Sequence, residues 1–337
     1  MDVNGVVRRP MVHAFLGRSI GTLTLLAIFY GSLCALGWAQ ETWPNRPIRL
    51  IVPLTAGGGV DLMARITAQH LSDQLGQQVV VENEGGAGGT IAANMVTHSR
   101  PDGYTLIFQS VSSAVVNALV YKNLQYDPIK DLIPVTLAGS FPLVLIVNSH
   151  LPAKDLSELI RLLKNNPGKY SYGSSGVGTM PYLAGELFKS MARVDVVHVP
   201  YRGNSAVMVD LFAGRIAMMF TGPPGNIQSG KVRALAITTA ERSPVLPNIP
   251  SMADTLPGYA IEYWTAIFAP AGTPKEIVER IAAETNKAMK NPEVVRRFGE
   301  IGIVGVGSSP QELDRYWHQQ FDFLGKIVKE ANVKPAD

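Results

Sequence analysis

From Trp43 onward, short runs of β-branched and aliphatic residues alternate with segments whose apolar residues recur every three or four positions. This alternation is typical of βα units built around a mainly parallel sheet, and it predicts an α/β fold. The predicted strands cover residues 48–52, 78–82, 104–108, 143–147, 169–172, 194–199, 216–220 and 234–238. The predicted helices cover residues 61–75, 91–98, 181–190 and 205–213, with another opening at Asp155.

Two later helices are predicted from their first residues. The runs Thr273-Pro274-Lys275-Glu276 and Ser309-Pro310-Gln311-Glu312 each combine a capping hydroxyl, a proline at the first helical position and a reciprocal glutamate. Such capping boxes satisfy amide groups that have no partner inside the helix.

Two extended apolar stretches, residues 134–148 and 261–269, join regions that have complete βα patterns of their own. They predict a chain that leaves one lobe, builds a second lobe and returns, so that two strands form a hinge. The expected lobes are residues 40–140 with 265–337, and residues 141–264. A hinge of this kind permits closure around a ligand.

The first 39 residues have the composition of a cleavable export signal. Arginines precede an apolar stretch over residues 20–36, and Gly37-Trp38-Ala39 supplies small residues at a cleavage site after Ala39. The alternative is an uncleaved anchor, although the apolar run is short for a membrane span. The pair Arg8-Arg9 leaves the export route open between the general secretory and twin-arginine systems. We therefore expect a periplasmic protein.

Cleavage would remove Cys34, the only cysteine, and leave a mature chain of 337 − 39 = 298 residues. Leu33 precedes this cysteine, which disfavours lipid attachment. A mature chain without thiols has no disulfide, no cysteine-bound metal and no thiol nucleophile. Its basic residues fall to 30 − 3 = 27 and its acidic residues to 27 − 1 = 26. Without a basic cluster, we expect no nucleic-acid partner.

Four loops that precede helices concentrate glycine and hydroxyl-bearing residues: residues 53–61, 82–90, 173–179 and 200–205. Glycine allows the backbone to approach a ligand closely, and free amides at a helix start attract anions. In parallel sheets, ligands bind beyond the carboxyl ends of strands, where these loops are expected. A single such loop is most simply a tight turn, but two in each expected lobe favour a shared anion site.

Motifs for nucleotide binding and catalysis are incomplete. No loop fits the phosphate-binding GxxxxGK[ST] pattern or the GxGxxG pattern, and Val177 stands where a GxSxG nucleophile elbow needs glycine. The histidines lack metal-ligand spacing, so neither a metal nor a cofactor is expected. His198 is interpreted as structural and Asp61 as a helix N-cap. An enzyme acting through Ser174 or Ser175 would need an adjacent base, for which the sequence offers no strong candidate.

The chain closely resembles the Bug family of extracytoplasmic solute receptors, the binding components associated with tripartite tricarboxylate transporters. The resemblance covers nearly all of the mature chain, in ordered motifs at residues 43–49, 57–61, 81–89, 101–105, 172–179, 183–188, 198–203, 233–236 and 269–274. It implies a Venus-flytrap fold of the type II periplasmic-binding-protein kind. It also implies a ligand carboxylate held by backbone amides, hydroxyls and water.

Carried over by position, the expected ligand-binding residues lie in the loops and strand ends of both lobes. They are Gly57, Gly58, Gly59, Val60, Asp61, Ser110, Ser112, Ser113, Ser174, Ser175, Gly176, Gly178, Thr179, Tyr201 and Thr221. The chain departs from the family pattern at Val60, Ala114, Tyr182 and Thr221, where polar or charged residues are common. These changes favour a carboxylate with an apolar or aromatic body over an amino acid.

Three functions are compatible with this sequence. The first is a monomeric receptor that delivers a small organic carboxylate to membrane permease subunits. The second is a sensor whose closed form engages the ectodomain of a sensor kinase. The third, less favoured, is a secreted serine hydrolase.

Overall fold

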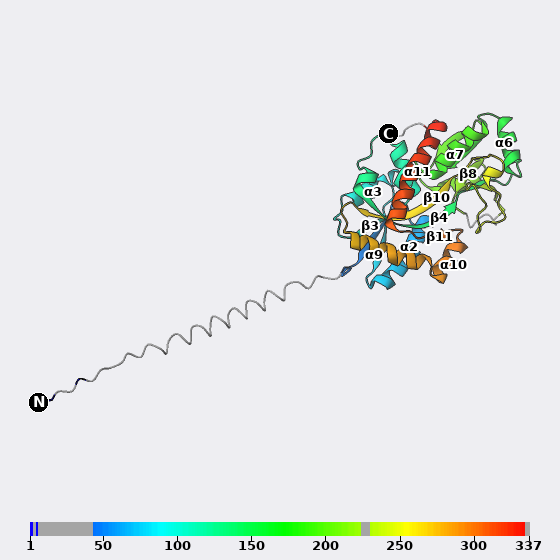
Figure 1. Ribbon diagram of the computed structural model, residues 1–337. Coiled ribbons are helices and arrows are strands. Elements are labelled where there is room, and N and C mark those ends of the chain that lie inside the picture. Colours follow the sequence, from blue (N-terminus) through cyan, green and yellow to red (C-terminus); the bar gives the residue numbers. More distant parts are fainter. Residues whose placement is uncertain (3–4, 6–42, 224–229, 334–337) are drawn as a thin grey trace. The chain divides into compact units, whose positions relative to one another are not determined.

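The computed structural model describes residues 1–2, 5, 43–223 and 230–333, which fall into two units, Met1–Asn45 and Arg46–Asp337. Nearly all of the predicted export signal lies outside the described residues. Among the described residues, no helix has both the length and the apolarity that a membrane crossing requires. The second unit contains two sheets flanked by helices (Figure 1).

The first sheet has the strand order β11-β4-β10-β3-β1-β2. Its strands are β1 (Ile48–Val52), β2 (Val79–Asn83), β3 (Thr105–Ser110), β4 (Leu132–Pro142), β10 (Glu262–Pro270) and β11 (Val304–Gly305). The helices of this part are α2 (Gly59–Leu75), α3 (Thr90–Thr97), α4 (Asn117–Val120), α5 (Pro128–Asp131), α9 (Lys275–Met289), α10 (Pro292–Glu300) and α11 (Pro310–Glu330). Two short turns, η1 (Ala87–Gly89) and the π-helical η2 (Ser112–Val116), precede α3 and α4.

The second sheet has the strand order β7-β6-β8-β5-β9. Its strands are β5 (Val144–Asn148), β6 (Ser171–Ser174), β7 (Val197–Pro200), β8 (Met218–Thr221) and β9 (Val232–Ile237). Its helices are α6 (Leu156–Lys164), α7 (Met180–Ala192) and α8 (Asn204–Phe212), and the short turn η4 (Met252–Asp254) follows β9.

Both sheets are mixed, so the prediction of mainly parallel sheets needs correction. In the first sheet β1 pairs in parallel with β2 and β3, whereas β10 is antiparallel to β3 and β4. In the second sheet β6 is parallel to β7 and β8, whereas β5 is antiparallel to β8 and β9. The path of the chain explains the mixed pairing. After β4 the chain passes from the first sheet into β5 of the second sheet, and it returns to the first sheet through β10, which runs opposite to β4. The two crossing segments are therefore antiparallel strands of the first sheet.

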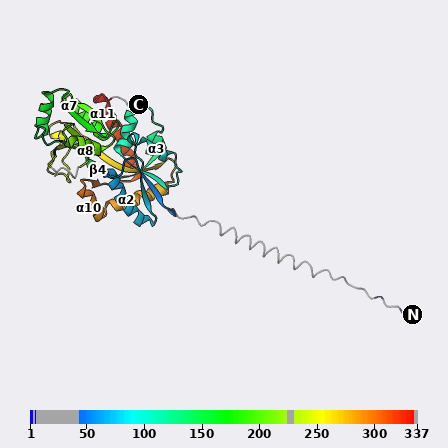
Figure 2. The ribbon, with the colours of Figure 1, turned by 180° about the vertical axis from the view of Figure 1, so that it is seen from behind.

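The α11 helix links the packing of both sheets. Its Trp317 ring meets Phe268 of β10 at 4.8 Å between centroids, and its indole Nε1 donates to the Ala114 carbonyl at 3.1 Å. Figures 1 and 2 both show α11 beside α7, and the Ser190 hydroxyl of α7 donates to the Glu330 carbonyl at 3.3 Å. One helix therefore packs on the first sheet and touches a helix of the second.

The predicted helix starts differ in outcome. Ser309 forms the complete capping box with Glu312 at the start of α11. At α9 the prediction is wrong, because Pro274 is the N-cap and the Thr273 hydroxyl donates to the Pro270 carbonyl at 2.7 Å. The chain therefore turns into α9 through a strand-end hydrogen bond instead of a capping box.

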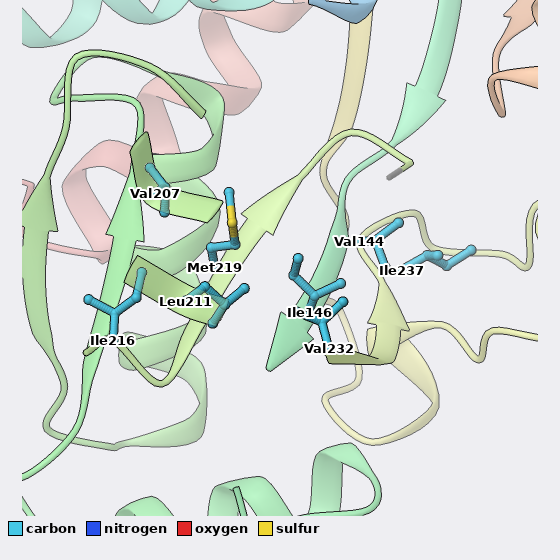
Figure 3. Close-up of a cluster of buried hydrophobic side chains, with 8 residues drawn as sticks. All are labelled: Val144, Ile146, Val207, Leu211, Ile216, Met219, Val232 and Ile237. Atoms are coloured by element: carbon cyan, nitrogen blue, oxygen red, sulfur yellow. The ribbon is translucent and has the colours of Figure 1, made fainter. Parts of the chain in front are cut away.

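The second sheet has its own apolar core between β5, β8, β9 and α8 (Figure 3). The buried side chains of this cluster are Val144, Ile146, Val207, Leu211, Ile216, Met219, Val232 and Ile237. Gly173 of β6 lets this core close, because a Cβ at that position would lie 2.4 Å from Val207 Cγ1 and 2.7 Å from Ile216 Cδ1. The α8 helix thus packs directly against the backbone of the strand that leads into the third glycine-rich loop.

Replacing Gly173 with alanine is expected to destabilise the protein by about 1–3 kcal/mol, the usual cost of overpacking a core. Gly299 is the matched control: it lies in helix α10, and an added Cβ there meets no atom within 4 Å. Gly299→Ala should stabilise the fold slightly, because alanine favours the helix. Guanidinium unfolding measures both. Equal effects of the two substitutions would contradict the described packing of α8.

Candidate functional site

The loop after β1 presents an open helix start. Helix α2 begins at Gly59 with Gly58 as its N-cap, and no side chain caps it. A Cβ added at Gly57, Gly58 or Gly59 would meet no atom within 4 Å. Gly57, Gly58 and Gly59 are exposed, so the start of this 17-residue helix is uncapped and open to solvent, as an anion site requires.

Asp61 lies within the first turn of α2, so its prediction as the N-cap is wrong. Its carboxylate accepts the Gly57 amide at 2.9 Å, Arg65 Nε at 3.1 Å and Asn83 Nδ2 at 3.0 Å. Burial alone would raise the pKa of Asp61, but these hydrogen bonds outweigh it and hold the pKa below its usual value. Asp61 is thus a buried anchor for the loop.

The segment after β3 brings three serines into the interior. Ser110, Ser112 and Ser113 are buried, and the Ser113 hydroxyl donates to the Ser110 carbonyl at 3.2 Å. The Ser112 hydroxyl accepts the Met180 amide at 3.0 Å. Since Met180 opens α7, this contact joins the end of a strand in the first sheet to a helix of the second.

The loop after β6 is held from within. The Gly176 amide donates to the Ser174 hydroxyl at 3.1 Å, and the Thr179 hydroxyl donates to the Gly176 carbonyl at 2.7 Å. Ser174 Oγ also lies 2.7 Å from His198 Nε2. Ser174, Gly178 and Thr179 are buried, whereas Ser175 and Gly176 are partly exposed.

The structure places His198 beside Ser174, a neighbour that the sequence did not reveal. The imidazole lies between the rings of Tyr172 and Tyr182, with centroids at 4.8 and 4.7 Å. Burial lowers the pKa of His198 to about 4. A general base works best with a pKa near the working pH, and Ser174 is fully buried. This pair is suited to positioning the loop and not to nucleophilic attack.

A carboxylate that could complete a triad is engaged elsewhere. Glu186 accepts the Tyr172 hydroxyl at 2.6 Å and Lys189 Nζ at 2.9 Å. The Ser–His–acid geometry of hydrolases needs an acid that orients the imidazole. Among the described contacts, Glu186 instead neutralises Lys189 beside the buried Tyr172.

Tyr201 and Thr221 lie at the margins of the predicted site. The Tyr201 hydroxyl donates to Asp210 Oδ2 at 2.8 Å, and its ring packs on the second-sheet core. Thr221 is buried at the end of β8, and a Cβ at the neighbouring Gly222 would lie 3.1 Å from the Phe141 ring. Tyr201 therefore supports the third loop, whose Ser174 carbonyl accepts its amide at 3.0 Å.

The sequence prediction missed an aromatic pair on the two crossing strands. Phe141 of β4 and Tyr263 of β10 are opposite each other in register, and their rings stack at 4.6 Å with an interplanar angle of 22°. The buried Tyr263 hydroxyl lies near the Ser110 and Ser112 hydroxyls. The one available signal was that both aromatics fall where the crossing segments were predicted.

The predicted serines and threonines are mostly buried. Two surface pockets lie away from these residues. One, of about 400 Å³, is lined by residues that include Arg46, Arg49 and Arg100. Arg49 is paired with Glu82 and Arg46 with Asp102, which offsets much of its positive charge. Another lies between Leu119 and the α11 helix.

Comparison with known proteins identifies the family. Residues 63–333 match the model of the tripartite tricarboxylate transporter family receptor. The chain belongs to this family. Among its receptors, BugT of Bordetella pertussis is 34% identical over 318 residues, covering 93% of this chain and 98% of BugT.

Solved structures of related receptors share this fold. Rpa4515 of R. palustris, described with adipate, has a TM-score of 0.84 at 35% identity and covers 87% of this chain and 100% of its own. MatC of Rhodopseudomonas palustris, described with bound malate, has a TM-score of 0.78 at 31% identity, covering 85% and 100%. The two-sheet α/β architecture is thus that of periplasmic solute-binding receptors, and the predicted type II fold class is confirmed.

The buried imidazole predicts how the stability of this receptor depends on pH. The pKa of His198 is about 4 in the folded protein and about 6.5 when the chain is unfolded. Between these values only the unfolded chain takes up this proton, so the free energy of unfolding falls as the pH falls from 6.5 to 4. Guanidinium unfolding at several pH values measures this slope. His198→Gln should reduce the slope. An identical slope in the wild type and in His198→Gln would contradict the described environment of His198.

Proposed function

We propose that this receptor captures a small organic carboxylate between its two sheets in the periplasm. The observation that carries the proposal is the convergence of glycine- and serine-rich segments at the carboxyl ends of β1, β3 and β6. The open first turn of α2 supplies amides for an anion, and the buried serines supply hydroxyls. The relatives described with adipate and malate support a carboxylate as the ligand class.

In this proposal the parts of the chain move as two lobes, residues 40–140 with 265–337 and residues 141–264. The burial of Ser110, Ser112 and Ser174 supports an opening motion, because a solute needs access to them. The paired strands β4 and β10 supply the hinge. Closure would exclude water, which strengthens hydrogen bonds between amides and a carboxylate.

The body of the ligand is proposed to be apolar or aromatic. The stacked rings of Phe141 and Tyr263 lie beside Ser110, Ser112 and Gly222, so an apolar wall adjoins the polar groups. Val60, Ala114, Tyr182 and Thr221, where charged or polar residues are common in the family, add no formal charge. An amino group on the ligand would then have no carboxylate partner among these residues.

The partner is proposed to be a pair of membrane permease subunits, with the receptor acting as a monomer exported by its N-terminal segment. The description of the family as transporter receptors supports this choice over a sensor kinase. In membranes that contain the permease, carboxylate uptake should depend on added receptor. Uptake that is equal with and without the receptor would contradict this partnership.

A thermal-shift panel tests the ligand class. Adipate, malate, benzoate and aspartate are added to receptor that has been unfolded and refolded to remove bound solute. A bound ligand stabilises the folded state by RT ln(1 + [L]/Kd), about 2.7 kcal/mol at a hundred times Kd. Stabilisation by the carboxylates that lack an amino group is expected. Stabilisation by aspartate alone would contradict the proposed ligand chemistry.

Substitution at Gly58 tests the position of the site. A leucine there fits the backbone, whose φ is −84°, and its Cβ meets no atom within 4 Å, but its side chain would occupy the space in front of α2. Gly58→Leu should therefore keep its unfolding midpoint without ligand and lose the ligand-induced shift. Exposed Gly299 of α10, outside the proposed site, also has open space around an added Cβ, and Gly299→Leu serves as the control. A ligand shift retained in Gly58→Leu would place the anion elsewhere.

A further inference from the structure

Three side chains of the segment after β3 contact the loop that opens α7. Ser112 accepts the Met180 amide at 3.0 Å, and the Tyr121 hydroxyl donates to the Val177 carbonyl at 3.3 Å. Asn117 lies between them in the sequence and is fully buried. Since these residues follow a strand of the first sheet and α7 belongs to the second, the contacts bridge the two sheets directly.

Asn117 fills the space between two glycine turns. Its Nδ2 donates to the Gly88 carbonyl at 2.9 Å, in the loop after β2. A Cβ at Gly178, in the loop after β6, would lie 2.9 Å from Asn117 Oδ1 and 2.7 Å from the Tyr121 ring. Gly178 also has a φ of +81°, which side chains rarely adopt. Only a residue without a side chain lets the two loops approach this closely.

Ser112 also connects this contact to the crossing strands. The Tyr263 hydroxyl on β10 lies near Ser110 and Ser112, and Tyr263 stacks on Phe141 of β4. The Ser112 hydroxyl therefore accepts a hydrogen bond from the Met180 amide at the start of α7, and it also lies near the Tyr263 hydroxyl on β10, a strand that joins the sheets. A change in the angle between the sheets must alter this arrangement.

We propose that Ser112, Asn117 and Tyr121 form a closing contact with residues 177–180 that stabilises the closed receptor without help from the ligand. The inference deepens the proposed function, since it rests on two lobes that open and close. These three are positioning residues. They hold the loop after β2 and the loop after β6 at the separation that a ligand bound between these loops would require. The closed form is then populated before a solute binds, which raises the apparent affinity by removing part of the cost of closure.

Distances between spin labels test the closing contact. Labels are attached to cysteines at Asp73 on α2 and Lys164 on α6, both exposed, in the full chain carrying Cys34→Ser. The refolded protein is measured without any carboxylate, and then with adipate. Two populations are expected without carboxylate, a shorter closed distance and a longer open distance.

Gly178→Ala is the decisive variant, because its Cβ would separate the loops. Its matched control is Gly258→Ala: Gly258 has a similar φ of +87° but no atom within 4 Å of an added Cβ. Gly178→Ala should lose the closed population, while Gly258→Ala should keep the wild-type ratio. Ser112→Ala and Tyr121→Phe, which leave the backbone unstrained, should each lower the closed-to-open ratio roughly five-fold, as expected for one ordinary hydrogen bond.

The proposal is overturned if the wild type shows only the longer distance without carboxylate, or if Gly178→Ala matches Gly258→Ala while the two hydrogen-bond variants keep the wild-type ratio. A misfolded Gly178→Ala would leave the test to the two hydrogen-bond variants. Failure of the proposed function appears separately: the closed population would exist and respond to Gly178→Ala, but no carboxylate of the thermal-shift panel would stabilise the protein.

Discussion

The antiparallel pairing of β4 with β10 is the interaction on which the rest of the structure depends. It extends from Glu262 opposite Pro142 to Pro270 opposite Leu132; β4 leads into the second sheet and β10 follows that sheet in the chain. All of β10 except Glu262 is buried, and so is most of β4. Because β10 also pairs with β3, this one ladder fixes where the β3 end and its serines lie relative to the crossing.

The proposed anion site uses dipoles more than charges. Its nearest formal charge is the carboxylate of Asp61, which by itself would repel a carboxylate ligand. Arg65 and Asn83 offset that charge, and the Gly57 amide uses one of its oxygens to shape the loop. The acidic residue thus organises the backbone of the site, while the open amides of α2 face outward. Neutral His198 plays the same part in the other half, where it holds Ser174 without adding charge.

Local patterns predicted most of the fold. Predicted and observed strands and helices differ by one to three residues at most boundaries, because alternation and helical periodicity are local signals. The α10 helix and the short β11 strand were not predicted, and the sheets were predicted as mainly parallel. The direction of β4 and β10 depends on the path between sheets, which no local pattern contains.

The candidate site was predictable only in part. Glycine-rich loops before helices are visible in the sequence. In the structure, the loops that follow β1, β3 and β6 lie at the carboxyl ends of these strands. The Ser174–His198 pair joins residues on neighbouring strands 24 positions apart, so its geometry could not be anticipated. The same is true of Asn117 between Gly88 and Gly178, where two turns distant in sequence leave room for one amide side chain. Such fits depend on tertiary packing, which sequence spacing does not specify.

The strand order also dictates the order in which the chain can fold as it is made or exported. The central β10 begins 262 − 142 = 120 positions after β4 ends, while every strand of the second sheet is complete by Ile237. Because the chain is made from its amino terminus, all strands of the second sheet are available for pairing before β10 is. Until β10 arrives, β3 and β4 expose unpaired apolar edges, a state prone to aggregation. The same long-range pairing predicts slow folding of the first sheet.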